Sequence, residues 1–303
     1  MFPIRDLNFR ATSAASVLMH CVACGSLFPR RFPSAATLGE AYGGYYTTSP
    51  RPGPFRRWLR RVGELSRGAY ILRGLPKEAR TLLDYGCGSG EYLSGVTAER
   101  RALEAFGTDL APPAHLGRGF RWLDLDQIES VAPFDWITLS HVLEHVASPA
   151  EVMARLASLL SPEGALWVAT PNASGFLFAA AGAWARDVDF PRHRQIFSRG
   201  ELVRLMSEAG LEADFQPAPR LNAVLNSLSS LRNILTDHTA SLRRRLGASL
   251  AVCIGLARHL LETGDQGGRA SPELIALCRR RPAVLFSAGA SCDEATGTLE
   301  KAR

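Results

Sequence analysis

The feature that most constrains this chain is a glycine-rich turn that directly follows a short apolar stretch. Residues 81–92 read Thr-Leu-Leu-Asp-Tyr-Gly-Cys-Gly-Ser-Gly-Glu-Tyr. Glycines let a backbone turn sharply while a ligand lies against it, because they have no Cβ. An amphipathic pattern follows, and the helix that it predicts would point its first free N–H groups into the turn. The sequence therefore predicts a nucleotide-like ligand at the carboxyl edge of a parallel sheet.

The residues around the turn exclude two common nucleotide sites. A dinucleotide site needs a small residue at the sixth position counted from Gly86, and Glu91 stands there. A pyrophosphate would also be repelled by the carboxylates of Asp84 and Glu91. The turn is not a P-loop either, because no Gly-Lys-Ser/Thr follows it. A ligand with a positive charge and no phosphate, such as S-adenosylmethionine, suits the turn better.

Strand-length apolar runs alternate with helical patterns around the turn. The apolar runs, each bounded by turn or polar residues, lie at 81–85, 104–108, 134–139 and 164–169. Residues 149–160 have a helical pattern, and residues 161–164 are its stop signal. Strands and helices in alternation predict an α/β protein whose parallel sheet is covered on both faces.

Polar residues stand where these strands end. They are Asp84, Asp109, Asp124 and His141. The carboxyl ends of parallel strands meet at one edge of a sheet, and ligands bind there. Each aspartate could instead cap a helix or form a turn. The register of Asp109 and Asp124 with the glycine turn favours ligand binding.

Read in order, the same segments resemble the class I S-adenosylmethionine-dependent methyltransferases. The resemblance covers roughly residues 79–215, and its motifs follow one another at the family's spacing. The matching segments are 82–90 (first motif), 105–109 (second strand), 122–125 (the adenine-contacting turn), 134–146 (fourth strand), 167–172 (fifth strand), and Pro191-Arg192-His193 with Phe197-Ser198. The 134–146 segment is similar to the branch that includes the ubiquinone-biosynthesis O-methyltransferases.

The resemblance implies a Rossmann-like, seven-stranded, mostly parallel sheet with helices on both faces, and S-adenosyl-L-methionine as the cofactor. It also implies that Asp109 holds the ribose hydroxyls, that Asp124 accepts from the adenine amino group and that His141 lines the methionine end. The full set of expected cofactor contacts is Asp84, Gly86, Cys87, Gly88, Gly90, Asp109, Leu110, Asp124, Leu125, Ser140 and His141.

Methyl transfer asks the protein mainly to align the nucleophile, the methyl carbon and the sulfur. An oxygen nucleophile with a high pKa also needs a base, and the candidates are His193 and His141. Nitrogen or carbon acceptors could need none. We expect the acceptor to be the hydroxyl of a small molecule, such as a sugar, a quinone-like ring or a secondary metabolite.

Two other functions stay open. A non-catalytic S-adenosylmethionine-binding protein would keep the fold without turnover, although the intact turn and Asp109 argue against it. A nucleic-acid methyltransferase would suit the net charge of +6. However, the Asn/Asp-Pro-Pro-Tyr/Phe type of motif is missing after the fourth strand, and aromatic residues are not interleaved with the arginines. We therefore expect no nucleic-acid partner.

Two groups of residues have the side chains that metals prefer. Cys21 and Cys24 resemble half of a zinc ribbon, but a tetrahedral site needs four ligands and no second pair precedes them. We expect a ribbon-like hairpin without metal. His141, Glu144 and His145 would share one face if a helix begins there, and could bind a divalent cation. The preferred alternative is that His141 lines the cofactor while Glu144 and His145 pack and cap.

Charge and hydropathy indicate which compartment and which surfaces the protein could occupy. The arginines form three clusters, at 56–61, 243–245 and 279–281, which could contact phosphate or an anionic membrane surface or could be solvated faces. We find no convincing secretory signal and no run of about 18 apolar residues. A cytoplasmic protein is expected, and its six cysteines should then be free thiols. The oligomeric state is left open.

The chain divides into six expected segments. They are a degenerate zinc-ribbon-like arm (1–47), a helical linker (48–78), the cofactor-binding core (79–220), a helical insertion (221–268), the last strand of the core (269–285) and a disordered tail (286–303). The insertion should contain two helices, at about 221–236 and 240–262, of which the second is apolar nearly all round. That helix could lie on a membrane or bind a partner, but we expect it to be a buried lid over the substrate pocket.

Overall fold

The computed structural model describes residues 2–46, 68–110, 112, 117–261 and 271–281. Its strands are β1 (Phe2–Arg5), β2 (Ala15–His20), β3 (Leu27–Pro29), β4 (Thr81–Tyr85), β5 (Glu104–Thr108), β6 (Arg121–Trp122), β7 (Phe134–Ser140), β8 (Leu160–Pro171), β9 (Leu211–Gln216) and β10 (Glu273–Arg280). Its helices are α1 (Ala35–Tyr46), α3 (Glu91–Glu99), α4 (Pro149–Ser158), α5 (Phe176–Ala181), α6 (Arg199–Glu208), α7 (Arg220–Thr236) and α8 (Leu242–Leu261), with short 3-10 turns at Ile128–Ser130 and Gly182–Trp184. Residues 68–74 are also helical.

Seven strands form the main sheet, in the order β6-β5-β4-β7-β8-β10-β9. The first five are parallel, whereas β10 runs antiparallel to both of its neighbours. This confirms the expected α/β class and the mostly parallel sheet. The chain steps outward from β4 to β6 and then returns to β7 on the other side of β4. Such a reversal opens a crevice at the carboxyl ends of β4 and β7, where ligands of open parallel sheets bind.

Each face of the sheet has its own hydrophobic core, because neighbouring side chains of a strand point to opposite faces. In β4, Leu83 belongs to one cluster and Leu82 to the other. Helices α4 and α6 cover the Leu83 face, for example through Met153 and Leu205. Helix α3 and residues 68–74 cover the Leu82 face. The core thus holds the carboxyl ends of the strands in a fixed register.

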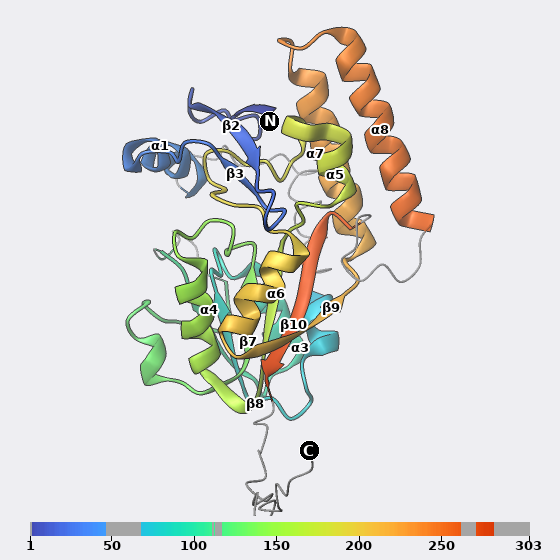
Figure 1. Cartoon of the computed structure of the whole chain (residues 1–303). Helices are drawn as coiled ribbons and strands as arrows, with labels where there is room; N and C mark the ends of the chain where they lie inside the picture. Colours follow the sequence, from blue (N-terminus) through green and yellow to red (C-terminus); the bar gives the residue numbers. More distant parts are fainter. Residues whose placement is uncertain (1, 47–67, 111, 113–116, 262–270, 282–303) are drawn as a thin grey trace, which may run out of the picture.

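A second layer lies beyond the carboxyl ends of the parallel strands (Figure 1). It contains the small antiparallel sheet β1-β2-β3 and the helices α5, α7 and α8, and we call it the cap. A third hydrophobic cluster joins these elements, with members such as Leu18 of β2, Leu177 of α5 and Val252 of α8. The amino-terminal arm and the helical insertion therefore share one core, although some 200 residues separate them in the sequence.

A buried arginine ties the arm to the segment that carries His193. Arg192 is 1% exposed and donates to both carboxylate oxygens of Asp189, at 2.9 and 2.7 Å. It also donates to Asp6, just after β1, at 3.0 Å, and its guanidinium lies over the ring of Phe9. A planar fork with two carboxylate partners gives this contact a defined geometry.

Three expectations need correction. Helix α8 is not buried: only Val252 and His259 of its 20 residues are, because it packs on α5 and α7 with one side and leaves the other outside. The stop at residues 161–164 lies within β8, where a bulge shifts the pairing with β7. His141 begins a turn instead of a helix, with a left-handed φ of +55°.

The helices expected at 221–236 and 240–262 are present as α7 and α8, and the strand expected from residue 271 is β10. Other expectations lie outside the described residues: the arginines at 56–61, most of the 48–78 linker, the end of the insertion and the 286–303 tail. Among the described residues, no helix has the length and apolar character needed to cross a membrane.

Candidate active site

The glycine turn after β4 is held in place by the neighbouring strand. The backbone N–H groups of Gly86 and Cys87 both donate to the carbonyl of Thr108 in β5, at 2.8 and 2.9 Å. The N–H of Gly88 donates to the carboxylate of Asp109, also at 2.8 Å. Asp109 therefore holds the glycine turn in place through this bond. It stands at the carboxyl end of β5, as the sequence predicts.

Two of the glycines are required by the protein's own packing. A Cβ on Gly86 would lie 2.2 Å from Cγ2 of Val142, and a Cβ on Gly90 would lie 2.3 Å from the ring of Phe120. Gly88 differs: its φ is +55°, and a Cβ there would meet no described atom within 4 Å. The turn thus presents bare backbone to open space at Gly88, as a loop that cradles a ligand does.

A buried hydrogen-bond chain orients Asp84 beneath the turn. The hydroxyl of Thr138 donates to Asp84 at 2.7 Å, so the hydroxyl of Tyr92, 2.7 Å from Thr138, must donate to it in turn. Burial, and after it the carboxylates of Asp84 and Asp109, raise the pKa of the Cys87 thiol well above its usual value. Cys87 is therefore a small neutral side chain in the turn.

The remaining expected cofactor residues follow β5, β6 and β7. Leu110 is exposed beside Asp109, and its N–H donates to that carboxylate at 2.7 Å. Asp124 is exposed after β6 and accepts from the indole N–H of Trp122. Leu125 is partly buried and packs against the core cluster, so only part of its side chain is open to a ligand.

Two hydroxyls at the strand ends are buried and lack a partner. The side-chain oxygens of Thr108 in β5 and Ser140 in β7 make no hydrogen bond with any described residue. Buried polar groups are nearly always paired, so an orphaned hydroxyl indicates that a ligand or water completes it. Both lie at the edge of the sheet where the glycine turn presents its backbone.

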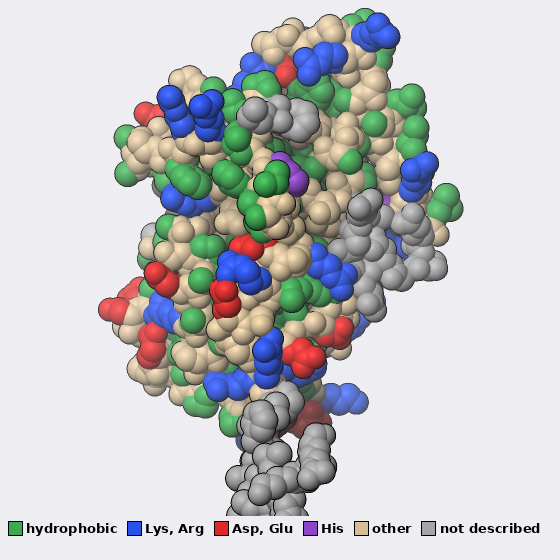
Figure 2. All heavy atoms as spheres, in the orientation of Figure 1, with side chains coloured by type: hydrophobic (Ala, Val, Ile, Leu, Met, Phe, Trp, Pro, Cys, Tyr) green, Lys and Arg blue, Asp and Glu red, His purple; other side chains and the backbone are tan. Residues whose placement is uncertain are grey.

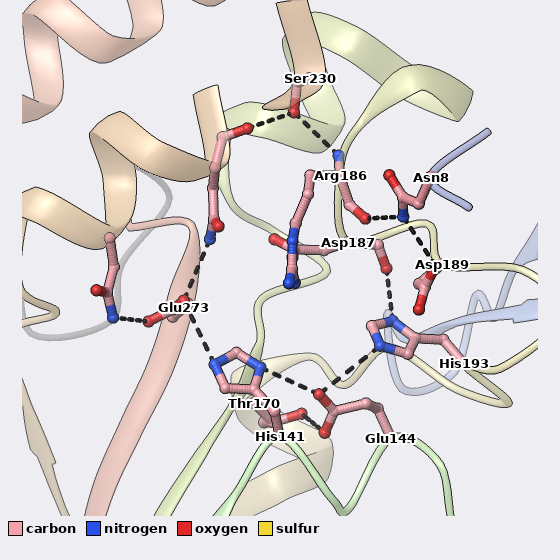
Figure 3. Close-up of polar contacts among 12 residues, drawn as sticks. Asn8, His141, Glu144, Thr170, Arg186, Asp187, Asp189, His193, Ser230 and Glu273 are labelled. Atoms are coloured by element: carbon pink, nitrogen blue, oxygen red, sulfur yellow. Dashed lines mark hydrogen bonds and ion pairs between the residues drawn. The ribbon is translucent and has the colours of Figure 1, made fainter. Parts of the chain in front are cut away.

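His141 lies between two carboxylates (Figure 3). Its Nδ1 is 3.2 Å from Glu144 and its Nε2 is 3.5 Å from Glu273, at the start of β10. Burial alone would lower the pKa of His141, but these two carboxylates raise it to about 9. His141 is therefore an imidazolium at neutral pH. Asn222 and Asn226 of α7 hold Glu273 in turn, at 3.1 and 3.2 Å.

His193 has the opposite character. Its Nδ1 lies 2.7 Å from the carbonyl of Asp187, which can only accept, so Nδ1 carries the proton and Nε2 is bare. Burial, and then the neighbouring His145, lower the pKa of His193 to about 4. The bare Nε2 faces Glu144 at 3.9 Å. His193 is thus a neutral histidine behind Glu144, on the far side of that carboxylate from His141 (Figure 3).

The group that could hold a metal differs from the expected one. Glu144, His145 and His193 offer donor atoms within 4.8 Å of one another, whereas His141 is not part of the group. Both carboxylate oxygens of Glu144 already interact, one with His141 and one with the hydroxyl of Thr170. His145 Nδ1 lies 3.1 Å from the Tyr42 hydroxyl. Two members of the group, Glu144 and His145, thus also have protein partners.

Cys21 and Cys24 lie in the turn between β2 and β3. The N–H of Gly25 donates to the carbonyl of Cys21, and the Ser198 hydroxyl donates to the carbonyl of Cys24. Among the described residues, no third histidine, cysteine or acid joins them in a group of metal-binding geometry. Strands β2 and β3 thus pair as a hairpin, and its turn contacts Ser198, the residue before α6; whether it derives from a zinc ribbon stays a prediction.

Two cavities border the histidines. One, with room of about 10 Å³, is lined by Tyr70, His141, Trp167, Ala169, Pro219, Asn222, Glu273 and Ile275. The other, also of about 10 Å³, lies between the arm and the 188–196 segment and includes His193. The first contains His141, which follows Ser140 directly at the carboxyl end of β7. It is therefore the one on the side of the expected cofactor residues.

Several residues of this site were not expected from the sequence. Glu273 is the most important, and a signal was available: a glutamate that opens an otherwise apolar strand is unusual unless it is paired. Thr138 and Tyr92 gave no comparable signal, because each fits an ordinary strand or helix. The contacts of Asn222 and Asn226 with Glu273 could be recognised only in the tertiary structure.

Comparison with known proteins decides the family. A family model described as a methyltransferase domain matches residues 55–214, just over half of the chain. The chain belongs to the S-adenosylmethionine-dependent methyltransferases.

The relatives of this methyltransferase include the ubiquinone biosynthesis O-methyltransferase of Thiobacillus denitrificans, 31% identical over 161 residues that span 46% of this chain and 67% of that protein. The protein of the same name from Xylella fastidiosa is 32% identical over 189 residues, which span 56% of this chain and 74% of that protein. A solved O-methyltransferase family protein from Burkholderia thailandensis is similar with a TM-score of 0.41 and 20% identity, over 51% of this chain and 54% of that chain.

The residues at the sheet edge of the methyltransferase fit its cofactor. The open space at Gly88 and the orphaned hydroxyls of Thr108 and Ser140 call for a polar ligand along this edge. Asp84 and Asp109 make the edge negative, which suits a ligand with an amino group and a sulfonium and would repel a pyrophosphate.

Proposed function

We propose that this methyltransferase transfers a methyl group to a hydroxyl oxygen of a small molecule. The names of the relatives, which are O-methyltransferases, support an oxygen acceptor. The observation that carries the proposal is the His141–Glu273 pair, which lines a cavity next to the cofactor edge. A hydroxyl needs both a hydrogen-bond donor and an acceptor, and this pair supplies one of each.

In this proposal the cofactor lies along the glycine turn. Gly86, Cys87, Gly88 and Gly90 supply the turn, and Asp84 supports it from below. Asp109 and Leu110, with Asp124, hold the nucleoside, while Ser140 and His141 reach the methionine end. Leu125, which is partly buried, offers the rest of its side chain to the adenine. When bound, S-adenosylmethionine supplies a methyl group that is already activated.

The acceptor then binds at the cavity beside His141, whose free space of about 10 Å³ must widen to admit a ring. Tyr70 and Trp167 form its aromatic wall, which suits a planar ring. The imidazolium of His141 donates a hydrogen bond to the reacting oxygen and stabilises the negative charge that develops on it. Glu273 accepts the proton of the hydroxyl. Its distance of 3.5 Å from His141 is longer than a normal hydrogen bond, so both groups can engage a hydroxyl between them.

A carboxylate base suits an acidic hydroxyl, such as that of a phenol or an enol, better than an alcohol. An alcohol would require a stronger base. His193 does not supply one, because its pKa is lowered to about 4, and it lies behind Glu144 and does not line this cavity. We therefore favour a quinone-like or phenolic acceptor over a sugar, and a positioning role for His193.

The test is a panel of phenolic, enolic and sugar hydroxyls with the full chain, in which released S-adenosylhomocysteine is measured. Glu273→Gln keeps the shape and should lower kcat by about 100-fold or more with a phenolic acceptor, because a general base contributes about 10²–10⁴-fold. S-adenosylmethionine affinity should stay near that of the wild type. His193→Gln is the matched control, with a small effect. A large loss in His193→Gln and none in Glu273→Gln would assign the base to His193. Cofactor binding without turnover on any acceptor would favour the non-catalytic alternative.

We also propose that the protein works in the cytoplasm. The five described cysteines are all free thiols, which fits a reducing compartment.

A further inference from the structure

Helix α8 exposes a continuous apolar face. Its outward side chains follow one another at helical spacing and share one side of the helix. They are Leu242 (62% exposed), Leu246 (59%), Leu250 (63%), Ile254 (47%) and Leu261 (82%). Monomeric soluble proteins seldom expose an apolar stripe of this length without a use for it.

The other side of α8 is packed tightly. Val252 and His259 are buried in the cap, and Gly255 lies so close to Phe176 of α5 that an added Cβ would come within 2.4 Å of the ring. The helix is thus fixed to the cap, and its apolar stripe faces away from the molecule.

Basic residues border the stripe. Arg243 and Arg244 lie at its start and Arg258 near its end, and all three are exposed. Neither α7 nor α8 contains an aspartate or glutamate. Figure 2 shows hydrophobic side chains along the edge of the molecule where α8 lies, with basic side chains towards both ends.

This charge pattern decides what covers the stripe. A second copy of the chain, related by a two-fold axis, would bring the same face against itself. Its arginines would then meet arginines, with no carboxylate on either helix to balance them. An anionic lipid surface offers what both parts of the face need: acyl chains for the leucines and negative headgroups for the arginines.

We infer that α8 docks the protein onto the surface of a bilayer that contains anionic phospholipids. The helix lies flat in the interface, with its leucine stripe among the upper acyl carbons and its arginines at the headgroups. Helices α7 and α8 belong to the same cap that borders the acceptor cavity, so docking places this cavity near the membrane. The inference does not depend on the proposed acceptor.

The experiment is flotation of the full chain with vesicles of neutral phosphatidylcholine, and of phosphatidylcholine with about one third phosphatidylglycerol. The wild type should float with the anionic vesicles, less with the neutral ones, and less in high salt because exposed charges are screened. Leu246→Glu with Leu250→Glu should weaken binding to anionic vesicles by at least about tenfold, since the buried stripe is lost. Arg243→Glu with Arg258→Glu should weaken it by a similar factor and leave the weak binding to neutral vesicles unchanged.

Matched controls use residues of the same kind elsewhere. Val203→Glu changes a side chain that is 44% exposed on α6, and Arg101→Glu changes an exposed arginine between α3 and β5. Both should float as the wild type does. Circular dichroism and thermal unfolding should show all variants folded, because every altered side chain is exposed.

Three results would overturn the inference. Equal binding to neutral and anionic vesicles would remove the role of the arginines. Binding that the leucine pair does not reduce would remove the role of α8. A dimer in analytical ultracentrifugation that the leucine pair abolishes, together with no vesicle binding, would assign the face to a second copy of the chain.

Discussion

Alanine substitutions at Gly88 and Gly86 test two different reasons for a glycine in the turn. Gly88 should leave room for the ligand, whereas Gly86 leaves room for a side chain of the protein itself. Both glycines have left-handed φ values, +55° and +83°, so either alanine incurs about 1–2 kcal/mol of backbone strain. At Gly86 the new Cβ would also lie 2.2 Å from Val142, and such overpacking adds about 1–3 kcal/mol. At Gly88 it would meet no described atom within 4 Å.

We therefore expect Gly88→Ala to be the more stable variant. At about 2–4 °C for each kcal/mol in a protein of comparable size, Gly88→Ala should lower Tm by about 2–8 °C and Gly86→Ala by about 4–20 °C. Cofactor binding should nevertheless suffer in Gly88→Ala: its S-adenosylmethionine affinity should fall at least about tenfold, which is 1.4 kcal/mol. The reason is that the methyl group of the alanine occupies the open space beside the turn.

Differential scanning calorimetry of the ligand-free protein and isothermal titration with S-adenosylmethionine and S-adenosylhomocysteine measure the two quantities separately. The reasoning is refuted if Gly88→Ala binds both ligands as tightly as the wild type while its Tm falls as expected. The open space beside Gly88 would then not belong to the cofactor.

Three further predictions test other parts of the site. Asp109→Ala should weaken S-adenosylmethionine binding at least about tenfold in titration calorimetry, because it removes both the proposed ribose contact and the 2.8 Å bond to Gly88; an unchanged affinity would show that the ribose lies elsewhere. His141 has a raised pKa of about 9, so its ion pairs contribute stability that is complete below its unfolded value near 6.5 and is lost as pH rises through 9. The Tm difference between the wild type and His141→Asn, a residue that tolerates the left-handed backbone, should shrink between pH 6 and pH 9.5, and a constant difference would contradict the assignment. Arg192→Ala should destabilise the fold by about 3–5 kcal/mol in denaturant unfolding, because it leaves buried Asp6 and Asp189 without their partner; Arg101→Ala, at an exposed site, should change little.

The sequence predicts the core well where the signals are local. Strands β4 and β5 begin and end at the predicted residues, because their apolar runs are bounded by turn residues. Strand β8 is longer than predicted, since it continues through Pro162 by means of a bulge, and a proline within a strand normally argues against one. The prediction that α8 is buried was wrong for a different reason. Its apolar pattern fixes the helix but not which of its sides another element covers.

In the cofactor half of the site, too, the residues that could be predicted are those with local signals. Asp84, Asp109, Asp124 and Ser140 could be placed at one edge because strand ends of a parallel sheet meet there. The pairing of His141 with Glu273 could not, because 132 positions separate them and the order of strands brings β10 beside β8 only in the folded sheet. The pKa values of His141 and His193 also depend on such distant partners, so two histidines that look equivalent in the sequence differ in charge.

Glu144 links the cofactor half of the site to the segment that carries His193, and this bears on how an acceptor would enter in the proposed function. Its carboxylate is fully buried and interacts with His141 and Thr170, while its carbonyl accepts from the N–H of Arg194 at 2.8 Å. Burial would raise the pKa of Glu144, but the hydrogen bond and positive charge of His141 lower it to about 2, so it stays ionised. Moving the segment around His193 away from the core would break the bond from the Arg194 N–H to the Glu144 carbonyl but would leave the Glu144 carboxylate paired with His141. Tyr70, which also lines the cavity, donates from its hydroxyl to the carbonyl of Pro217 at an exposed position. In the proposed function, breaking this exposed hydrogen bond would widen the cavity without unpairing Glu144.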